Sequence, residues 1–258
     1  MSSRWPGYLD AFHTRHPGIT ERVLCRARAA GGDAYDWLAQ AVPAATTVLD
    51  VACGSAPLWT LLPGRTYVGV DINAAELAAA RRRGAPGLTR AMAAALPVRD
   101  ASVDTVACSM ALQILTPLPR VLADISRVLR PGGRLVATVP ARHPLRATDL
   151  PVLAGLLAAL GRGLAYPNDG LLHRLPTLLR FAGLTVIADE HRRFRYRLRA
   201  GADADLFLAS LYLPELPEWR RRAARSYLRA LARARVSLPV PIRRITAQRP
   251  PSPGIGSS

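Results

Sequence analysis

Two short apolar segments, each carrying an aspartate at or near its end, constrain the fold of this chain more than any other feature. Residues 47–52 read Thr-Val-Leu-Asp-Val-Ala, and residues 67–71 read Tyr-Val-Gly-Val-Asp. Short apolar runs of this kind are typical of strands that are buried on both faces of a parallel sheet. The pattern therefore predicts an α/β fold in which Asp50 and Asp71 lie at the carboxyl ends of their strands.

The rest of the sequence alternates between helix-like and strand-like segments, as such a fold requires. Between residues 120 and 129 the apolar side chains recur at helical spacing, and Pro131-Gly132-Gly133 marks the end of that helix. The pattern also predicts helices at 74–83 and 171–182, and strands at 104–110, 134–139, 184–188 and 194–198.

These elements divide the 258 residues into four parts. We expect a helical extension at 1–45, the α/β domain at 46–200, a second helical extension at 201–249 and a disordered Pro/Gly/Ser-rich tail at 250–258. The apolar stretch 150–161 is too short to span a bilayer, and the N-terminus lacks the pattern of a signal peptide. We therefore expect a cytoplasmic protein.

The turn after Asp50 points to ligand binding. Residues 52–56 read Ala-Cys-Gly-Ser-Ala, and small side chains allow a backbone to approach a ligand closely. A carboxylate at the end of the next strand, Asp71, can accept hydrogen bonds from two ribose hydroxyls. A diphosphate site is disfavoured because the G-x-G-x-x-G pattern is absent and a chain without lysine cannot form a P-loop.

Four ordered motifs in this region resemble those of class I methyltransferases. Residues 48–54 are similar to the first motif of that family, and residues 69–73 look like the second. Residues 95–104, Ala-Leu-Pro-Val-Arg-Asp-Ala-Ser-Val-Asp, and the turn at 129–135 resemble stretches of its type-11, ubiquinone-biosynthesis-like group. The resemblance implies a Rossmann-like fold with a mostly parallel, seven-stranded sheet, helices on both faces, and S-adenosylmethionine as cofactor.

The resemblance also implies roles for ten residues. The methionine part of the cofactor would contact residues of the first motif, and the ribose would bind Asp71. The adenine would lie between Ile72 on one side and Met92 and Ala93 on the other, and Ser109 and Met110 would close the site. The predicted cofactor-binding residues are Asp50, Ala52, Gly54, Ser55, Asp71, Ile72, Met92, Ala93, Ser109 and Met110. The sequence indicates no metal site and no fixed acid–base pair, so no catalytic residue is named.

The sequence departs from the family pattern at three positions, two of them among these ten residues and the third in the same turn. Ala52 and Ala56 stand where members of the family often have glycine, and Met92 stands where an acid often binds the adenine amino group. The extra methyl groups lie close to the expected ligand. These departures leave open a non-catalytic protein that binds the cofactor.

The charge leaves a second function class open. The net charge is +17, and most of it falls in residues 191–258. All 35 basic residues are arginine, which is typical of a GC-rich genome and weakens the link to a nucleic-acid partner. Our first hypothesis is a methyltransferase that acts on a small molecule. The alternative is a nucleic-acid methyltransferase that uses the basic helix at 219–236, whose apolar face we assign to Trp219, Ala223, Tyr227, Leu231 and Ala234.

Several other polar residues carry weaker signals. Gln113 follows a predicted strand and is a candidate for the substrate pocket. His143 follows another strand and could face the same pocket as a base, although the pattern favours a solvated loop. The pattern likewise favours surface positions over a lid for His13 and His16. We interpret Cys53 as a small core residue.

Overall fold

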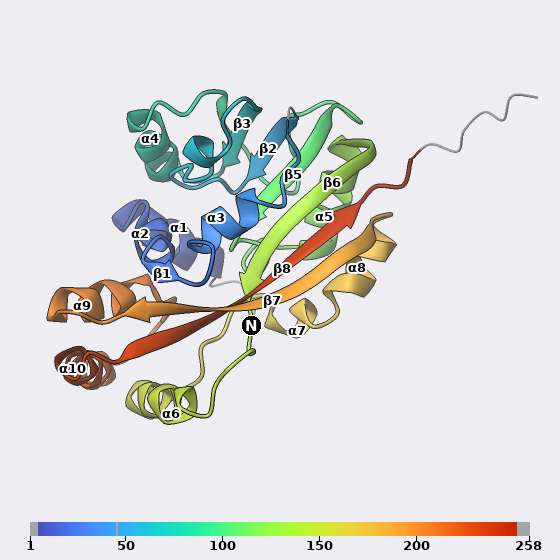
Figure 1. Cartoon of the computed structure of the whole chain (residues 1–258). Helices are drawn as coiled ribbons and strands as arrows, with labels where there is room; N and C mark the ends of the chain where they lie inside the picture. The colour runs from blue at the N-terminus through green and yellow to red at the C-terminus, as the bar shows by residue number, and fades with distance from the viewer. Residues whose placement is uncertain (1–4, 45, 252–258) are drawn as a thin grey trace, which may run out of the picture.

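The computed structural model describes residues 5–44 and 46–251. These residues form one eight-stranded sheet with the strand order β1-β7-β8-β6-β5-β2-β3-β4 (Figure 1). Strands β2 to β6 pair in parallel, whereas β8 pairs antiparallel with β6 and β7, and β1 pairs antiparallel with β7. The predicted Rossmann-like α/β class is confirmed.

The strands and helices have the following bounds. The strands are β1 Ala27–Arg28, β2 Thr47–Val51, β3 Thr66–Asp71, β4 Leu88–Arg90, β5 Val103–Ser109, β6 Leu129–Pro140, β7 Thr185–Arg197 and β8 Ser237–Gln248. The helices are α1 Trp5–Arg15, α2 Ile19–Leu24, α3 Ala34–Ala39, the 3-10 turn η1 Trp59–Leu61, α4 Ala74–Arg82, α5 Leu118–Val128, α6 Asp149–Leu160, α7 Asp169–Leu172, α8 Leu175–Phe181, α9 Gly201–Ser210 and α10 Glu218–Arg233.

The sheet has an apolar core on each face because successive strand residues point to opposite sides. In β2, Val48 packs into the core that contains Trp37 of α3, whereas Leu49 packs into the core that contains Leu122 of α5. All of these side chains are buried. The helical spacing of apolar residues at 120–129 therefore correctly predicted α5, which covers one face of the sheet.

The C-terminal region is not only helical, contrary to our expectation for residues 201–249. Helices α9 and α10 form as expected, but β8 runs through the sheet between β6 and β7. Pro239 and Pro241 hid this strand, because proline is rare in central strands. Both prolines lie in the part of β8 that pairs with β7 alone, since its pairing with β6 begins at Ile242.

We expected a sheet of seven strands, and the described part of the chain forms one of eight. The additional strand is β1, which comes from the N-terminal region and pairs Ala27 with Tyr196 at the end of β7. The two strands predicted at 184–188 and 194–198 are one long strand, β7, and the helix predicted at 171–182 is divided into α7 and α8. Most of the predicted tail lies outside the described residues.

Helix α10 buries a face next to the one that we predicted, and Tyr227 and Leu231 of the predicted face are partly buried against the same core. Ala224, Leu228 and Ala232 are buried, whereas more than half of the Trp219 side chain is exposed. Several positions of α10 are alanine, and this small side chain does not mark a face strongly. Figure 1 shows α6, α9 and α10 together at the end of the sheet where β7 ends and β8 begins.

No helix in the described ranges is long and apolar enough to cross a membrane.

Candidate functional site

A cavity of about 600 Å³ opens at the carboxyl ends of the parallel strands. Ligands of open α/β sheets bind at this edge. All ten residues that the sequence analysis selected line the cavity. The structure thus brings together residues from β2, β3 and β5 and from the segments that follow β2, β3, β4 and β5.

The turn after β2 keeps the backbone of a glycine-rich loop. Gly54 has a φ of +54°, and Ala52 and Ala56 have φ values of +56° and +55°. An L-residue in this left-handed region costs on the order of 1–2 kcal/mol, so the surrounding structure must hold the two alanines there. The departure from glycine therefore changes the residue but not the path of the chain.

Asp71, at the end of β3, is fixed by the backbone around it. Its Oδ2 accepts a hydrogen bond from the Gly54 amide, and its Oδ1 accepts one from the Asn73 amide, both at 2.8 Å. Burial raises the pKa of the Asp71 carboxyl, and these two amides oppose the rise. Each carboxylate oxygen can accept a further bond, which leaves Asp71 able to bind hydroxyl groups in the cavity.

Asp50 presents the second carboxyl group. Its side chain is buried, and its Oδ2 accepts a hydrogen bond of 2.7 Å from the Tyr67 hydroxyl. Burial raises the pKa of Asp50 to about 7. Its Oδ1 has no hydrogen-bond partner among the described residues. A buried carboxylate oxygen without a partner favours a donor from a ligand, above all a cationic one.

Two large apolar side chains are exposed at the same edge. Ile72 and Met92 leave 53% and 55% of their surface exposed, although both line the cavity. Apolar side chains at such positions can flank a flat ring, which is the role that the resemblance implies for them. Between them, Arg90 donates a hydrogen bond of 2.8 Å to the Ile72 carbonyl and holds this segment in place.

Helix α1 lies over the cavity, and sequence reasoning missed its role. Asn73 caps α4 through its side-chain oxygen, and its amide group donates to Asp10 and to the Thr14 hydroxyl of α1. Leu9, Asp10 and His13 of α1 line the cavity. The sequence did not indicate this role. Two residues four positions apart on a helix share a face, but their spacing does not show which other segment that face contacts.

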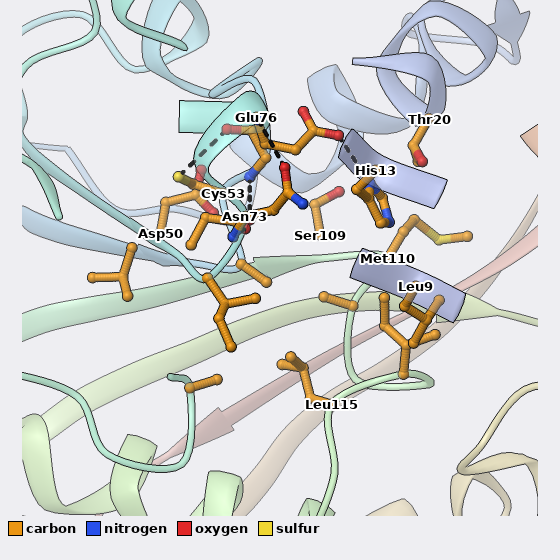
Figure 2. Close-up of a pocket in the computed structure, with 18 of the residues that line it drawn as sticks. Leu9, His13, Thr20, Asp50, Cys53, Asn73, Glu76, Ser109, Met110 and Leu115 are labelled. Carbon is orange, nitrogen blue, oxygen red and sulfur yellow. Dashed lines mark hydrogen bonds and ion pairs between the residues drawn. The ribbon is translucent and has the colours of Figure 1, made fainter. Parts of the chain in front are cut away.

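Glu76, His13 and Tyr212 meet in the cavity wall. His13 Nδ1 lies 2.9 Å from Glu76 Oε1, and His13 Nε2 lies 2.9 Å from the Tyr212 hydroxyl. Glu76 Oε2 also accepts a hydrogen bond of 2.9 Å from the Gly18 amide. Figure 2 shows His13 on the side of the cavity where Leu9 and Met110 are drawn, with Glu76 above Asn73. His13 is thus not on the outer surface, contrary to our interpretation, whereas His16 is exposed.

Ser55 forms a second link between the first turn and the N-terminal helices. Its hydroxyl donates a hydrogen bond of 2.6 Å to Glu21 Oε2, and Glu21 Oε1 pairs with Arg83 at 2.6 Å. Ser55 therefore faces the cavity with its hydroxyl proton already in use. Its hydroxyl oxygen remains able to accept a bond.

Of the other candidates, Cys53 lines the cavity, whereas Gln113 and His143 do not. Gln113 is buried and donates a hydrogen bond of 2.6 Å to the Met110 carbonyl, so it supports the wall from behind. His143 is exposed, and its ring lies 4.3 Å from that of His191. Cys53 is buried, and burial raises the pKa of its thiol. The described residues contain no cluster of side chains that could hold a metal ion.

The cavity fits S-adenosylmethionine on observations from this structure. The unpartnered Oδ1 of Asp50 suits the ammonium group of a methionine, and Asp71 suits the ribose hydroxyls. The left-handed turn at 52–56 leaves space beside the backbone, because a Cβ built on Gly54 meets no atom nearer than 3.6 Å. Ile72 and Met92 offer apolar surface to the adenine.

Comparison with protein-family models finds one match in this region. Residues 49–137 match a family described as a methyltransferase domain, of type 11. The match begins in the first of the four motifs and ends just after the last. It includes β2, β3, β5 and most of β6 with the turns that line the cavity.

Curated relatives match over part of their length. A demethylmenaquinone methyltransferase of Symbiobacterium thermophilum is 38% identical over 102 residues, which are 34% of this chain and 40% of that protein. A phthiotriol/phenolphthiotriol dimycocerosates methyltransferase of Mycobacterium tuberculosis is 29% identical over 178 residues, 60% of this chain and 65% of that protein. The chain thus spans less than two thirds of either relative.

A solved structure shares the fold. The cyclase SpnF superposes with a TM-score of 0.55 at 20% identity, and the match covers 84% of this chain and 81% of that one. At this identity the likeness concerns the arrangement of strands and helices alone. It agrees with a Rossmann-like sheet that extends beyond the residues of the family match.

Proposed function

We propose that the protein transfers a methyl group from S-adenosylmethionine to a small organic molecule, because residues 49–137 match a methyltransferase domain of type 11. When bound, the cofactor supplies an electrophilic methyl group on a positively charged sulfur. The protein contributes binding and orientation, which account for much of the acceleration of such transfers.

We assign the ten predicted residues to the cofactor as follows. Asp50 Oδ1 accepts from the ammonium group, and the turn formed by Ala52, Gly54 and Ser55 contacts the methionine chain. Asp71 accepts from the ribose hydroxyls. The remaining residues flank the adenine or close the site from β5, namely Ile72, Met92, Ala93, Ser109 and Met110.

The observation that carries this proposal is the unpartnered oxygen of Asp50 beside a glycine-type turn. A carboxyl group that is 1% exposed, with its pKa raised to about 7, destabilises the fold unless a ligand uses it. Two features support a small-molecule acceptor. The names of both relatives give small-molecule acceptors, and the cavity continues past the cofactor residues among apolar side chains.

Calorimetry with S-adenosylhomocysteine, the demethylated product, tests the cofactor part of the proposal. We expect one site per chain and a dissociation constant in the micromolar range. A folded protein that releases no heat and shows no thermal stabilisation with this compound would contradict the assignment. Incubation with labelled cofactor and mass spectrometry of extracted metabolites tests the transfer.

A nucleic-acid acceptor is the second candidate because of the arginines of α10. The structure weakens it, since Arg225 and Arg229 both form ion pairs with Asp205. Polynucleotide binding should be measured at low and physiological salt for the wild type and for a variant with Arg221, Arg225 and Arg229 changed to glutamine. Sub-micromolar binding that survives physiological salt and is lost in the variant would favour this candidate.

A further inference from the structure

Glu76, His13 and Tyr212 form a hydrogen-bonded row that the cofactor assignment does not use. The three residues come from α4, α1 and the loop after α9, and all of them line the cavity. His13 bridges the other two with contacts of 2.9 Å on each ring nitrogen. An acid, an imidazole and a hydroxyl in this order can move a proton in one direction.

The contacts of Glu76 determine which nitrogen of His13 carries the proton. Glu76 is buried, and its second oxygen accepts a hydrogen bond from the Gly18 amide. A carboxylate only accepts, so His13 Nδ1 must be the donor to Glu76. His13 Nε2 then has a free lone pair, and the Tyr212 hydroxyl donates its proton to it. The Thr20 hydroxyl also donates to the Tyr212 oxygen, which leaves one lone pair of that oxygen for a ligand.

We propose that Tyr212 accepts the proton of the methyl acceptor while it passes its own proton to His13, and that the acceptor is an apolar molecule with a phenolic hydroxyl. This inference rests on the proposed methyl transfer. The acceptor O–H bond breaks, its oxygen bonds to the methyl carbon, and the electron pair of the broken carbon–sulfur bond stays on sulfur. The acceptor's proton goes to the Tyr212 oxygen, and the proton of Tyr212 goes to His13 Nε2. The carboxylate of Glu76 stabilises the resulting imidazolium.

The strength of the terminal base limits the acceptor. An ordinary phenol has a pKa of about 10, whereas a hydroxyl as weak as that of water has one of about 16. A neutral imidazole therefore takes the proton of a phenol at a far lower cost in free energy. The row is therefore suited to phenols rather than aliphatic alcohols. Burial raises the pKa of Tyr212, so its phenolate does not persist and both protons must move together.

The neighbouring wall indicates an apolar body for the acceptor. Trp5 and Leu9 of α1 line this cavity together with Ile114 and Leu115 of the loop after β5. Figure 2 shows Leu9, Met110 and Leu115 on one side and the polar Asp50, Cys53 and Asn73 on the other. Apart from the row itself, the acceptor thus meets mostly hydrocarbon.

The test uses the full chain with S-adenosylmethionine and two probe phenols, 2-naphthol and 4-hexylphenol, and measures the methyl ethers formed. We expect the wild type to methylate at least one probe and not to methylate 1-octanol. Tyr212→Phe should lower kcat at least about 100-fold, with KM changed less than about threefold. Tyr166→Phe is the matched control. The ring of Tyr166 lies 6.1 Å from that of Tyr212, but Tyr166 does not line the cavity.

Chemical rescue separates proton transfer from a structural role. His13→Ala should lose activity to a similar extent and regain at least about tenfold in millimolar imidazole, whereas Tyr212→Phe should not respond. Titration of each variant with S-adenosylhomocysteine shows whether it is folded and binds the cofactor product. Wild type that binds this compound but leaves both phenols unmethylated would overturn the inference, as would Tyr212→Phe with wild-type kcat. Loss of binding in the wild type would instead contradict the proposed function.

Discussion

The cavity has two sides that differ in how they are built. Its floor, residues 50–56 with Asp71 and Ile72, consists of short segments at the ends of two strands, and nearby backbone amides hold its Asp71 carboxyl. Its roof, residues 5–21 with Tyr212, is attached through side chains to partners far away in the sequence. His13 and Tyr212 are separated by 199 residues, and Ser55 and Glu21 by 34.

The two sides of the cavity therefore suit two different ligands. The floor is set by local backbone geometry and is suited to a cofactor that is the same in every member of the family. The roof depends on side chains that can change independently, which suits the choice of acceptor. Asn73 and Glu76 join the two sides, since both lie at the start of α4 and bond to α1. Variants on each side, and at the junction, test whether floor and roof can be separated.

The largest effect is expected at the floor for Gly54→Val. A branched side chain would have to adopt a φ of +54° and would fill the space beside the backbone. We expect at least a 100-fold loss of affinity for S-adenosylhomocysteine, about 3 kcal/mol. Gly64→Val is the matched control, because Gly64 has a φ of +72° with no atom within 4 Å of an added Cβ. It should lose stability but keep native affinity, and equal losses in both variants would argue against the assignment of the turn.

Asp50→Asn should stabilise the protein in a pH-dependent way. The pKa of Asp50 is about 7 in the fold, above the usual value of about 3.9, so ionisation costs stability. That cost is absent below about pH 4, grows up to pH 7 and is constant above it. The stability of the variant relative to wild type should therefore rise by about 2.7 kcal/mol from pH 5 to pH 8, and the variant should bind S-adenosylhomocysteine more weakly.

Urea unfolding at several pH values measures this difference. Tyr67→Phe is the companion variant, because it removes the hydrogen bond that favours the ionised form. It should lose stability most at high pH. A difference between Asp50→Asn and wild type that does not vary with pH would show that this carboxyl is not a buried titrating group.

Asp71→Ala should weaken the binding of S-adenosylhomocysteine by roughly 1.5–3 kcal/mol, the range for hydrogen bonds to a charged group. Asp71→Asn keeps one acceptor for the Gly54 or Asn73 amide and should lose less. Calorimetry on variants with native circular dichroism makes the comparison. Unchanged affinity in a folded Asp71→Ala protein would remove Asp71 from the site.

The smallest effect is expected for Asn73→Ser, at the junction of floor and roof. Serine can still cap α4, but it lacks the amide that donates to Asp10 and Thr14. We expect about 1 kcal/mol of lost stability, faster hydrogen exchange in α1 and less than a threefold change in affinity for S-adenosylhomocysteine. A loss of affinity as large as that of Asp71→Ala would show that floor and roof act as one unit.

Local sequence patterns were enough to locate the floor and most of the sheet. Apolar runs and turn residues depend on neighbours along the chain, so β2, β3, β5, α5 and the turn at 52–56 could be predicted from the amino-acid sequence. The ten residues gathered at one edge because parallel strands end together. The same local signals did not reveal β8, whose prolines are tolerated only because part of that strand has a single neighbour.

The roof, by contrast, follows from tertiary packing. The sequence predicts a helical N-terminal region, but the segments against which α1 packs depend on the whole chain. His13 has a role only where Glu76 and Tyr212 reach it, and no local signal links residues 13, 76 and 212. The face of α10 was misassigned for the same reason, since alanine fits both buried and exposed positions. Side-chain contacts between distant segments form the roof of this cavity, and they are determined by packing rather than by sequence spacing.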